Sequence, residues 1–291
     1  MTSSVRYPAL MRSGPAGDGR RAAHPDPLAV MRCLTKRDRM ILSVLGEHQV
    51  LTTQQICDLA FPSLDLAQRR LLRLTQLSVV DRFRWRLPAG SEPWHYTLGM
   101  VGAALVAAER ATEPPRPAEL RKRSLRLATS PRLGHLLGIN GFFCALASEA
   151  RGDPGAALSE WWSERRCSEL YGELVRPDGY GAWTEGGPSV EFFLELDTGT
   201  EPLGQVAAKL AGYADLALAG GPGHRVLIWL PSAAREAHLH AHLAKQPPPR
   251  PVATATAELA AARGCSPAGA LWLAPGSRER RRLIGLTPDV P

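Results

Sequence analysis

Acidic residues in two segments of the chain could do chemistry together. Asp178 lies in "VRPDGY", while Glu195 and Asp197 stand two apart in "FFLELDTGTE", each at the edge of a strand-like run. Carboxylates at neighbouring strand ends suit Mg²⁺, a hard cation that takes oxygen ligands and waters. A metal ion there would stabilise charge on a phosphate and lower the pKa of a bound water. The alternative is that both segments are ordinary acidic turns.

The helix predicted after the second segment adds a candidate cation. Thr198 or Thr200 is expected to cap this helix, and Gln205, Lys209 and Tyr213 recur along it every four positions. These three residues therefore form one polar stripe. Lys209 could serve the same site, or it could simply extend from a surface helix into solvent.

The composition is that of a soluble globular protein with room for two domains. The 291 residues are 44% hydrophobic and 22% charged, and no run approaches the roughly 18 apolar residues that a membrane helix needs. The N-terminus lacks the apolar stretch of a secretory signal. Five scattered cysteines, none in a C-x-x-C pair, argue against a disulfide framework or a zinc site. We expect a cytoplasmic protein without a membrane partner.

Positive charge is concentrated in the first half of the chain. Residues 1–133 hold 21 Lys and Arg against 11 Asp and Glu, whereas the remaining residues hold 14 against 17. A basic N-terminal module suggests a polyanion as partner. The alternative is that arginine is abundant only because the genome is rich in G and C.

Proline-rich and basic segments divide the chain into parts. We predict a disordered tail over 1–34, a small domain over 35–110, a linker over 111–131 and a larger domain over 132–291.

The small domain contains three predicted helices and then a hairpin. Thr35 caps the first helix and Gly46 ends it, Thr52 or Thr53 caps the second, and Asp65 opens the third. The hydrophobic spacing then changes to two in "VVDRFRWRL", "PAGSEP" turns the chain and "WHYTLG" returns as a second strand. The residues expected to face the core are Met40, Ile41, Val44, Leu45, Ile56, Leu59, Ala60, Leu71, Leu74, Leu77, Phe83, Trp85 and Leu87. This order of elements is typical of a winged helix-turn-helix domain.

Two basic stripes on the small domain predict an interface for double-stranded DNA. The stripes are Arg69, Arg73 and Gln76 on the exposed face of the third helix, and Arg82, Arg84 and Arg86 on one face of the hairpin. The helix stripe lies where a helix would enter the major groove, and the hairpin stripe could follow phosphates. Winged helices also dock proteins, so protein docking is the alternative.

The larger domain is predicted to alternate helices and strands. A helix covers "RLGHLLGINGFFCALASEA", and strands follow in "LSEWWSERRCSEL", "GELVRPDGY" and "SVEFFLELD". After the striped helix come a buried strand "HRVLIWLP", a helix "SAAREAHLHAHLAK" and a late strand "GALWLAPG". On that last helix only His238 and His242 share a face, and a third ligand is missing, so we discount a histidine metal site.

The order αβββαβ with acids at strand ends resembles the core of the PD-(D/E)xK nuclease superfamily. The resemblance implies a restriction-endonuclease-like domain, which makes the whole chain an α+β protein with an N-terminal winged helix. It implies that Asp178 and Glu195 are catalytic carboxylates that bind Mg²⁺ or Mn²⁺, with a carbonyl ligand from Leu196. Asp197 stands where the superfamily has a lysine, so it either adds a metal ligand or begins the next helix cap. Lys209 is the implied catalytic replacement for that lysine.

Residues 35–245 together resemble the replication-relaxation family of bacterial plasmids and integrated mobile elements. The resemblance is carried by the "LTKRD" opening, "RPDG", "FLELDTGTE", and Lys209 with Tyr213. It implies a DNA-binding protein of plasmid replication or DNA relaxation. One hypothesis is a Mg²⁺-dependent endodeoxyribonuclease, and the other is a non-enzymatic replication initiator or transcription-type regulator with an inactive nuclease-like domain. Replication or conjugation proteins are candidate partners, and a dimer is compatible with the sequence.

Overall fold

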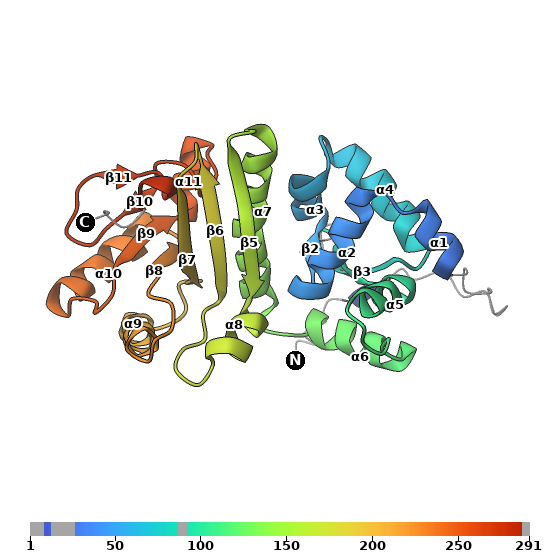
Figure 1. Ribbon diagram of the computed structural model, residues 1–291, viewed down its shortest axis with the longest axis horizontal. Helices are drawn as coiled ribbons and strands as arrows, with labels where there is room; N and C mark the ends of the chain where they lie inside the picture. The colour runs from blue at the N-terminus through green and yellow to red at the C-terminus, as the bar shows by residue number, and fades with distance from the viewer. Residues whose placement is uncertain (1–8, 13–26, 87–91, 287–291) are drawn as a thin grey trace, which may run out of the picture. The chain divides into compact units, whose positions relative to one another are not determined.

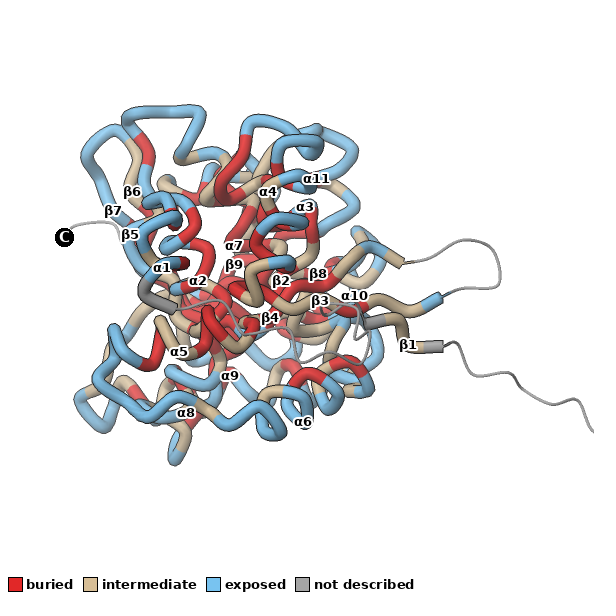
Figure 2. The backbone as a smooth tube through the Cα atoms, turned by 90° about the vertical axis from the view of Figure 1, so that its right-hand side faces the viewer, coloured by how far each residue is buried: buried red, intermediate tan, exposed pale blue. Residues whose placement is uncertain are grey.

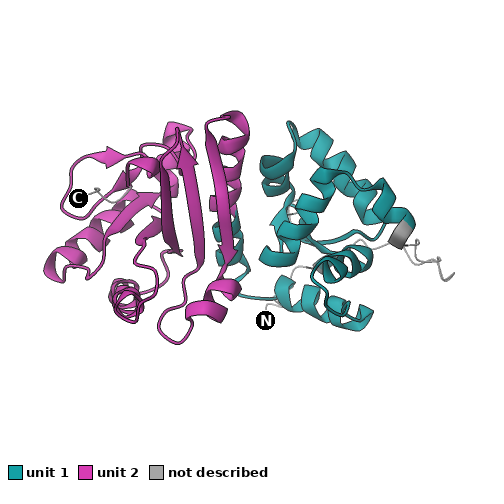
Figure 3. Ribbon diagram, viewed as in Figure 1, with its two compact units in different colours: residues 1–140 teal, residues 141–291 magenta. Residues whose placement is uncertain are grey.

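The chain divides into two compact units, residues 1–140 (unit 1) and residues 141–291 (unit 2), which Figure 3 colours separately. The structure, a computed structural model, describes residues 9–12, 27–86 and 92–286. Each unit combines helices with one β-sheet, so the fold is mixed α and β (Figure 1), consistent with the expected α+β class. In the part of the chain that is described, no helix is long and apolar enough to cross a membrane.

Unit 1 contains six helices in its described residues, and a seventh begins in it and ends in unit 2. The helices are α1 (Pro27–Cys33), α2 (Lys36–His48), α3 (Thr53–Ala60), α4 (Leu64–Gln76), α5 (Met100–Glu109), α6 (Pro117–Ala128) and the shared α7 (Leu133–Gly152). The strands are β1 (Ala9–Arg12), β2 (Leu51–Thr52), β3 (Val80–Arg86) and β4 (His95–Leu98). They pair antiparallel in the order β1–β3–β4–β2.

Side-chain caps begin the first helices where the sequence predicts them. Thr35 and Thr52 each accept a hydrogen bond from the backbone three residues on and complete a reciprocal capping box. The third helix is capped by Ser63 instead of opening at Asp65. The first helix continues past Gly46 to His48 and ends at Gln49, whose φ is 69°.

The buried face of α2 differs from the predicted one. Ile41 and Leu45 are buried as expected, but Met40 is 36% exposed and Leu42 is buried in its place. The reason is that the buried side chains of α2 follow positions 38, 41, 42 and 45, the usual spacing of one helix face. The face is therefore turned by about one position, and it includes the charged residue Asp38. The predicted inward faces of α3 and of α4 at Leu71 and Leu74 are confirmed.

Regular elements lie within the segments expected as tail and linker. Strand β1 pairs with β3, and α6 occupies most of residues 111–131, with Pro117 at its start and a box between Arg116 and Glu119. The Trp85 indole donates to the carbonyl of Ala128 at 3.2 Å, which ties β3 to the end of α6. Leu87 and residues 88–91 of the predicted turn lie outside the described residues.

Unit 2 is built on a mixed seven-stranded sheet. Its strands are β5 (Ala156–Ser163), β6 (Gly179–Glu185), β7 (Ser189–Leu196), β8 (Arg225–Leu230), β9 (Val252–Thr256), β10 (Trp272–Leu273) and β11 (Arg280–Arg281). Its helices are α8 (Glu164–Tyr171), α9 (Leu203–Leu218), α10 (Ala233–Lys245), α11 (Ala257–Arg263) and the 3-10 helix η1 (Leu283–Leu286). The strand order is β11–β10–β9–β8–β7–β6–β5, with β7, β8 and β9 parallel and the other pairs antiparallel.

Two predicted strands of unit 2 need correction. The segment "ERRCSEL" is helix α8, because Ser163 accepts the backbone N–H of Arg166 and caps a helix there. The segment "GELVRPDGY" is mostly turn, and β6 begins only at Gly179, directly after Asp178. Strands β7 and β8 and helix α10 are confirmed, whereas β9 and α11 were not expected.

The sheet of unit 2 buries both faces. On one face Phe142 and Phe143 of α7 contact the ring of Phe192. Gly181 is needed here, since a Cβ atom on it would lie 2.7 Å from the Phe143 ring. On the other face Phe193 packs with α9 and α10 in one core. Strand β9 is buried along its length (Figure 2). Because side chains alternate along β7, Glu195 lies on the face of Phe193, toward α9.

Candidate functional site

The start of β6 and the end of β7 bring two acidic residues together. These strands run antiparallel with Gly179 opposite Leu194, so Asp178 lies beside the end of β7. The carboxylate of Asp178 accepts the backbone N–H of Leu196 at 2.8 Å. Asp178 and Glu195 are both only 4% exposed. The expected adjacency of the two acids is therefore present, although Asp178 precedes a strand instead of ending one.

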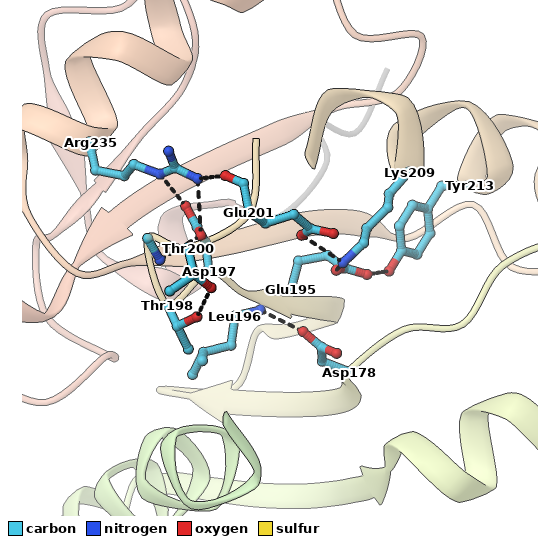
Figure 4. A network of polar contacts seen from close by, with 11 residues as sticks. Asp178, Glu195, Leu196, Asp197, Thr198, Thr200, Glu201, Lys209, Tyr213 and Arg235 are labelled. Carbon is cyan, nitrogen blue, oxygen red and sulfur yellow. Dashed lines mark hydrogen bonds and ion pairs between the residues drawn. The ribbon is translucent and has the colours of Figure 1, made fainter. Parts of the chain in front are cut away.

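Helix α9 supplies two partners to Glu195. The Tyr213 hydroxyl donates to one carboxylate oxygen at 2.5 Å, and the Lys209 ammonium donates to the other at 3.3 Å. Figure 4 shows both side chains pointing from α9 toward Glu195. They reach the same carboxylate because residues four apart share a helix face. The Lys209 ammonium also lies 3.3 Å from Glu201, and its side chain is 41% exposed.

Burial and neighbouring charge set the protonation of this cluster. Burial, with the nearby Asp178 carboxylate, raises the pKa of Glu195 to about 8. Burial alone would lower the pKa of Lys209, but the carboxylates of Glu195, Asp178 and Glu201 outweigh it and raise that pKa. Burial also raises the pKa of Tyr213 well above its ordinary value, so its hydroxyl keeps its proton and donates. The cluster thus places two buried carboxylates, those of Asp178 and Glu195, beside the ammonium group of Lys209.

Asp197 lies two residues from Glu195 but has different partners. Its carboxylate accepts hydrogen bonds from Arg235 of α10 at 2.6 Å and from the backbone N–H of Gly199 at 2.8 Å. Arg235 also donates to the carbonyl of Glu201. In Figure 4 Asp197 points toward Arg235 and away from Glu195. The structure therefore does not bring Asp197 to the other two carboxylates.

The helix after β7 begins later than predicted. Helix α9 starts at Leu203, and Thr198 and Thr200 lie in the preceding loop with their hydroxyls 3.1 Å apart. Neither threonine caps the helix, because Pro202 occupies the N-cap position. The loop from Asp197 to Pro202 is held instead by Arg235, which the sequence analysis did not single out.

His240 of α10 has a structural partner. His240 hydrogen-bonds to the buried Thr254 hydroxyl at 2.8 Å, and Thr254 donates to Glu236 at 2.6 Å. Throughout residues 9–12, 27–86 and 92–286, no group of three or more His, Cys, Asp or Glu side chains is arranged to hold a metal ion.

The predicted helix stripe of unit 1 is exposed. Arg69, Arg73 and Gln76 all face solvent on α4, and Arg69 pairs with Asp65 one turn away at 3.0 Å. A groove of about 430 Å³ lies between the start of α2 and α4, and arginines of both helices line it. One of them, Arg70, is held by the buried Asp38 carboxylate at 2.5 Å. The remaining arginines leave this groove positively charged.

The hairpin stripe is organised by an aromatic ring that sequence reasoning missed. The guanidinium groups of Arg82 and Arg84 lie 4.1 and 4.3 Å from the centre of the Trp94 ring. Trp94 directly precedes β4, and Arg86 is exposed at the end of β3. The sequence carried one indication of this contact. Trp94 stands at the start of the returning strand, opposite the alternating arginines.

The replication-relaxation family matches residues 42–225, more than half of the chain. The chain belongs to this family. No curated protein and no solved structure was found to match it.

Membership of the replication-relaxation family points to a role in replication or relaxation of plasmid or mobile-element DNA. The matched region contains α4, the hairpin, both buried acids, and Lys209 with Tyr213. The resemblance predicted from the sequence is thus confirmed at the level of the family.

Proposed function

We propose that this replication-relaxation protein binds duplex DNA through unit 1 and nicks or cuts it through unit 2. In this proposal unit 1 is a winged helix domain, and unit 2 is a divergent PD-(D/E)xK nuclease-like domain. The observation that carries the catalytic part is the pair of buried carboxylates, Asp178 and Glu195, beside the partly exposed Lys209. A buried acid with a raised pKa, as Glu195 is, beside a second buried acid and a cation is more typical of a functional site than of an ordinary turn.

The donor set fits Mg²⁺ or Mn²⁺. Mg²⁺ in proteins takes one or two carboxylates and keeps several waters, so a third acidic ligand is not required. Asp178 and Glu195 would hold the ion, which would stabilise charge on the phosphate and acidify a bound water. Burial and then the neighbouring Asp178 carboxylate raise the pKa of Glu195, and a divalent cation would relieve the repulsion between the two carboxylates.

The other residues of the cluster have separate tasks. Tyr213 holds Glu195 in one orientation through its hydroxyl. The backbone N–H of Leu196 fixes Asp178. Lys209, whose side chain is 41% exposed, would bind a phosphate oxygen and stabilise the charge that develops there. Asp197 with Arg235 would hold the loop between β7 and α9.

A nicking assay on supercoiled plasmid with Mg²⁺ or Mn²⁺ tests this proposal. We expect Asp178→Asn and Glu195→Gln to lower the nicking rate by about 100-fold or more, because each removes a ligand charge. Glu191→Gln is the matched control, since Glu191 lies on the same strand but is exposed. Mn²⁺ binding followed by electron paramagnetic resonance gives a second readout. A wild-type protein that neither nicks plasmid nor binds Mn²⁺ would refute the catalytic proposal.

A second candidate function is a non-enzymatic replication initiator or regulator. The observation that favours it is that both oxygens of Glu195 already accept hydrogen bonds, from Tyr213 and Lys209. In addition, the residue in the place of the superfamily's lysine, Asp197, is held by Arg235. Under this hypothesis the wild-type protein binds DNA and never nicks it, and Glu195→Gln leaves DNA binding unchanged.

A further inference from the structure

Unit 1 contains a cavity away from both basic stripes. The cavity has a volume of about 240 Å³ and lies between α2, α5, α6 and strand β4. Its apolar lining includes Leu45, Ala103, Val106, Leu120 and Leu127. Ligand pockets are commonly about 300–1,000 Å³, so this cavity suits a small molecule.

A buried hydroxyl without a partner lines the cavity. Thr97 of β4 is 8% exposed, and its Oγ1 atom has no hydrogen-bond partner in the structure. Leaving a buried polar group unpaired costs about 1–3 kcal/mol. A ligand with a polar group at this end would satisfy the hydroxyl.

Exposed charged residues also line the cavity. They are Arg110, Arg123 and Glu113, so that positive charge exceeds negative charge. The Arg110 guanidinium forms an ion pair with the Glu47 carboxylate at 3.6 Å. Arg123 has no ion-pair partner within the described ranges, and its guanidinium is thus available to an anion.

We propose that this cavity binds a small organic acid with an apolar body, a carboxylate at one end and a hydroxyl group at the other. The carboxylate pairs with Arg123, the body contacts the leucine and valine side chains, and the hydroxyl group bonds with Thr97. A phenolic acid such as 4-hydroxyphenylacetate has this combination of groups.

The bound acid would contact the elements that hold the hairpin. Thr97 pairs in register with Asp81 of β3, and Arg82 and Arg84 of the hairpin stripe follow Asp81. Another wall of the cavity is α6, and the Ala128 carbonyl at its end accepts a hydrogen bond from the Trp85 indole. We expect the acid to change the affinity of unit 1 for DNA, and this expectation rests on the proposed function.

Calorimetric titration of the full chain with three related compounds tests the site. We expect 4-hydroxyphenylacetate to bind more tightly than phenylacetate, which lacks the hydroxyl group, and than tyrosol, which lacks the carboxylate. Arg123→Gln should weaken binding of 4-hydroxyphenylacetate about three- to tenfold, since this arginine is exposed. Arg126→Gln is the matched control, because Arg126 is exposed on the same helix but does not line the cavity.

Thr97→Val separates the two ends of the ligand. This variant should bind phenylacetate as the wild type does and lose the preference for the hydroxylated acid. The proposal is overturned if 4-hydroxyphenylacetate does not bind, if Arg123→Gln and Arg126→Gln bind it equally, or if tyrosol binds as tightly. DNA affinity is measured separately with and without the acid. A protein that binds the acid but not DNA would contradict the proposed function while supporting the cavity site.

Discussion

Glu195 and Asp197 show how two neighbouring acids acquire different roles. Both are buried, and they stand two positions apart in the sequence. Glu195 meets a tyrosine and a lysine of α9, whereas Asp197 meets an arginine of α10. The difference arises because β7 ends at Leu196, so the alternation of side chains no longer decides where Asp197 points. Asp197, which Arg235 holds, therefore stabilises the loop after β7, whereas Glu195 lies beside Asp178 in the candidate site.

Asp38 allows a prediction about stability at the residue scale. Burial alone would raise the pKa of Asp38, but hydrogen bonds from Arg70 and Thr35 outweigh it and lower that pKa. Since the folded-state pKa is depressed, the stabilisation is present above the unfolded pKa of about 3.9 and is lost as pH falls below it. We expect Asp38→Asn to cost about 1–3 kcal/mol at pH 7, because it breaks a buried pair and a helix cap.

Urea denaturation of the wild type and variant at several pH values checks this prediction. The difference in unfolding free energy should narrow as the pH is lowered below about 4. The control is Asp65→Asn, which breaks the exposed pair with Arg69 and should cost about 0.5 kcal/mol or less. A difference that stays constant down to acidic pH would contradict the assigned role of Asp38.

Helix α4 has two faces with different tasks. Leu71, Leu74 and the inward-turned Arg70 attach it to the rest of unit 1. The opposite face carries Arg69, Arg73 and Gln76, all exposed. Of the arginines on α4, Arg70 therefore stabilises the fold, whereas Arg69 and Arg73 face solvent, where a partner can contact them.

The exposed face of α4 carries a prediction about DNA binding. We expect Arg69→Ala with Arg73→Ala to weaken duplex binding, because two phosphate or base contacts are lost. If both contact phosphates, the slope of log affinity against log salt concentration should fall by about two. Fluorescence anisotropy with labelled duplex at several salt concentrations measures both quantities. Arg121→Ala, on the exposed face of α6, is the control, and unchanged binding by the double variant would remove α4 from the interface.

At the scale of the whole molecule, charge and candidate chemistry belong to different units. The excess of Lys and Arg lies in residues 1–133, whereas Asp178, Glu195 and Lys209 belong to unit 2. A basic surface gives affinity for nucleic acid, and a buried acidic cluster gives a site for a cation. Under the proposed function, DNA binding and cleavage can therefore be separated experimentally.

Removal of the divalent cation should separate DNA cleavage from DNA binding. If the proposed function is correct, we expect excess EDTA to stop plasmid nicking while changing the DNA affinity by no more than about twofold, because the proposed phosphate contacts come from arginines. Anisotropy and nicking are measured on the same preparation. A large loss of DNA affinity in EDTA would show that the acidic site itself takes part in holding the DNA.

Several helices of this protein, among them α2, α3 and α4, were predictable because their causes are local. Thr35 and Thr52 cap helices through residues three positions on, and the inward faces of α3 and α4 follow from spacing within one helix. Strand β7 was predictable from its content of apolar residues, Val190, Phe192, Phe193, Leu194 and Leu196. The segment before Asp178 was not predictable in this way. It follows helix α8, which Ser163 caps, and its residues form a turn instead of the expected strand.

Residue identity is enough to show which acids are candidates, where charge is concentrated and to which family the chain belongs. Which groups meet depends on the packing of the elements. Asp178 reaches Glu195 through antiparallel pairing of β6 and β7, while Asp38 finds Arg70 and Asp197 finds Arg235 across packed helices and loops. Such partners lie well apart in the chain, and only the packing of elements brings them together.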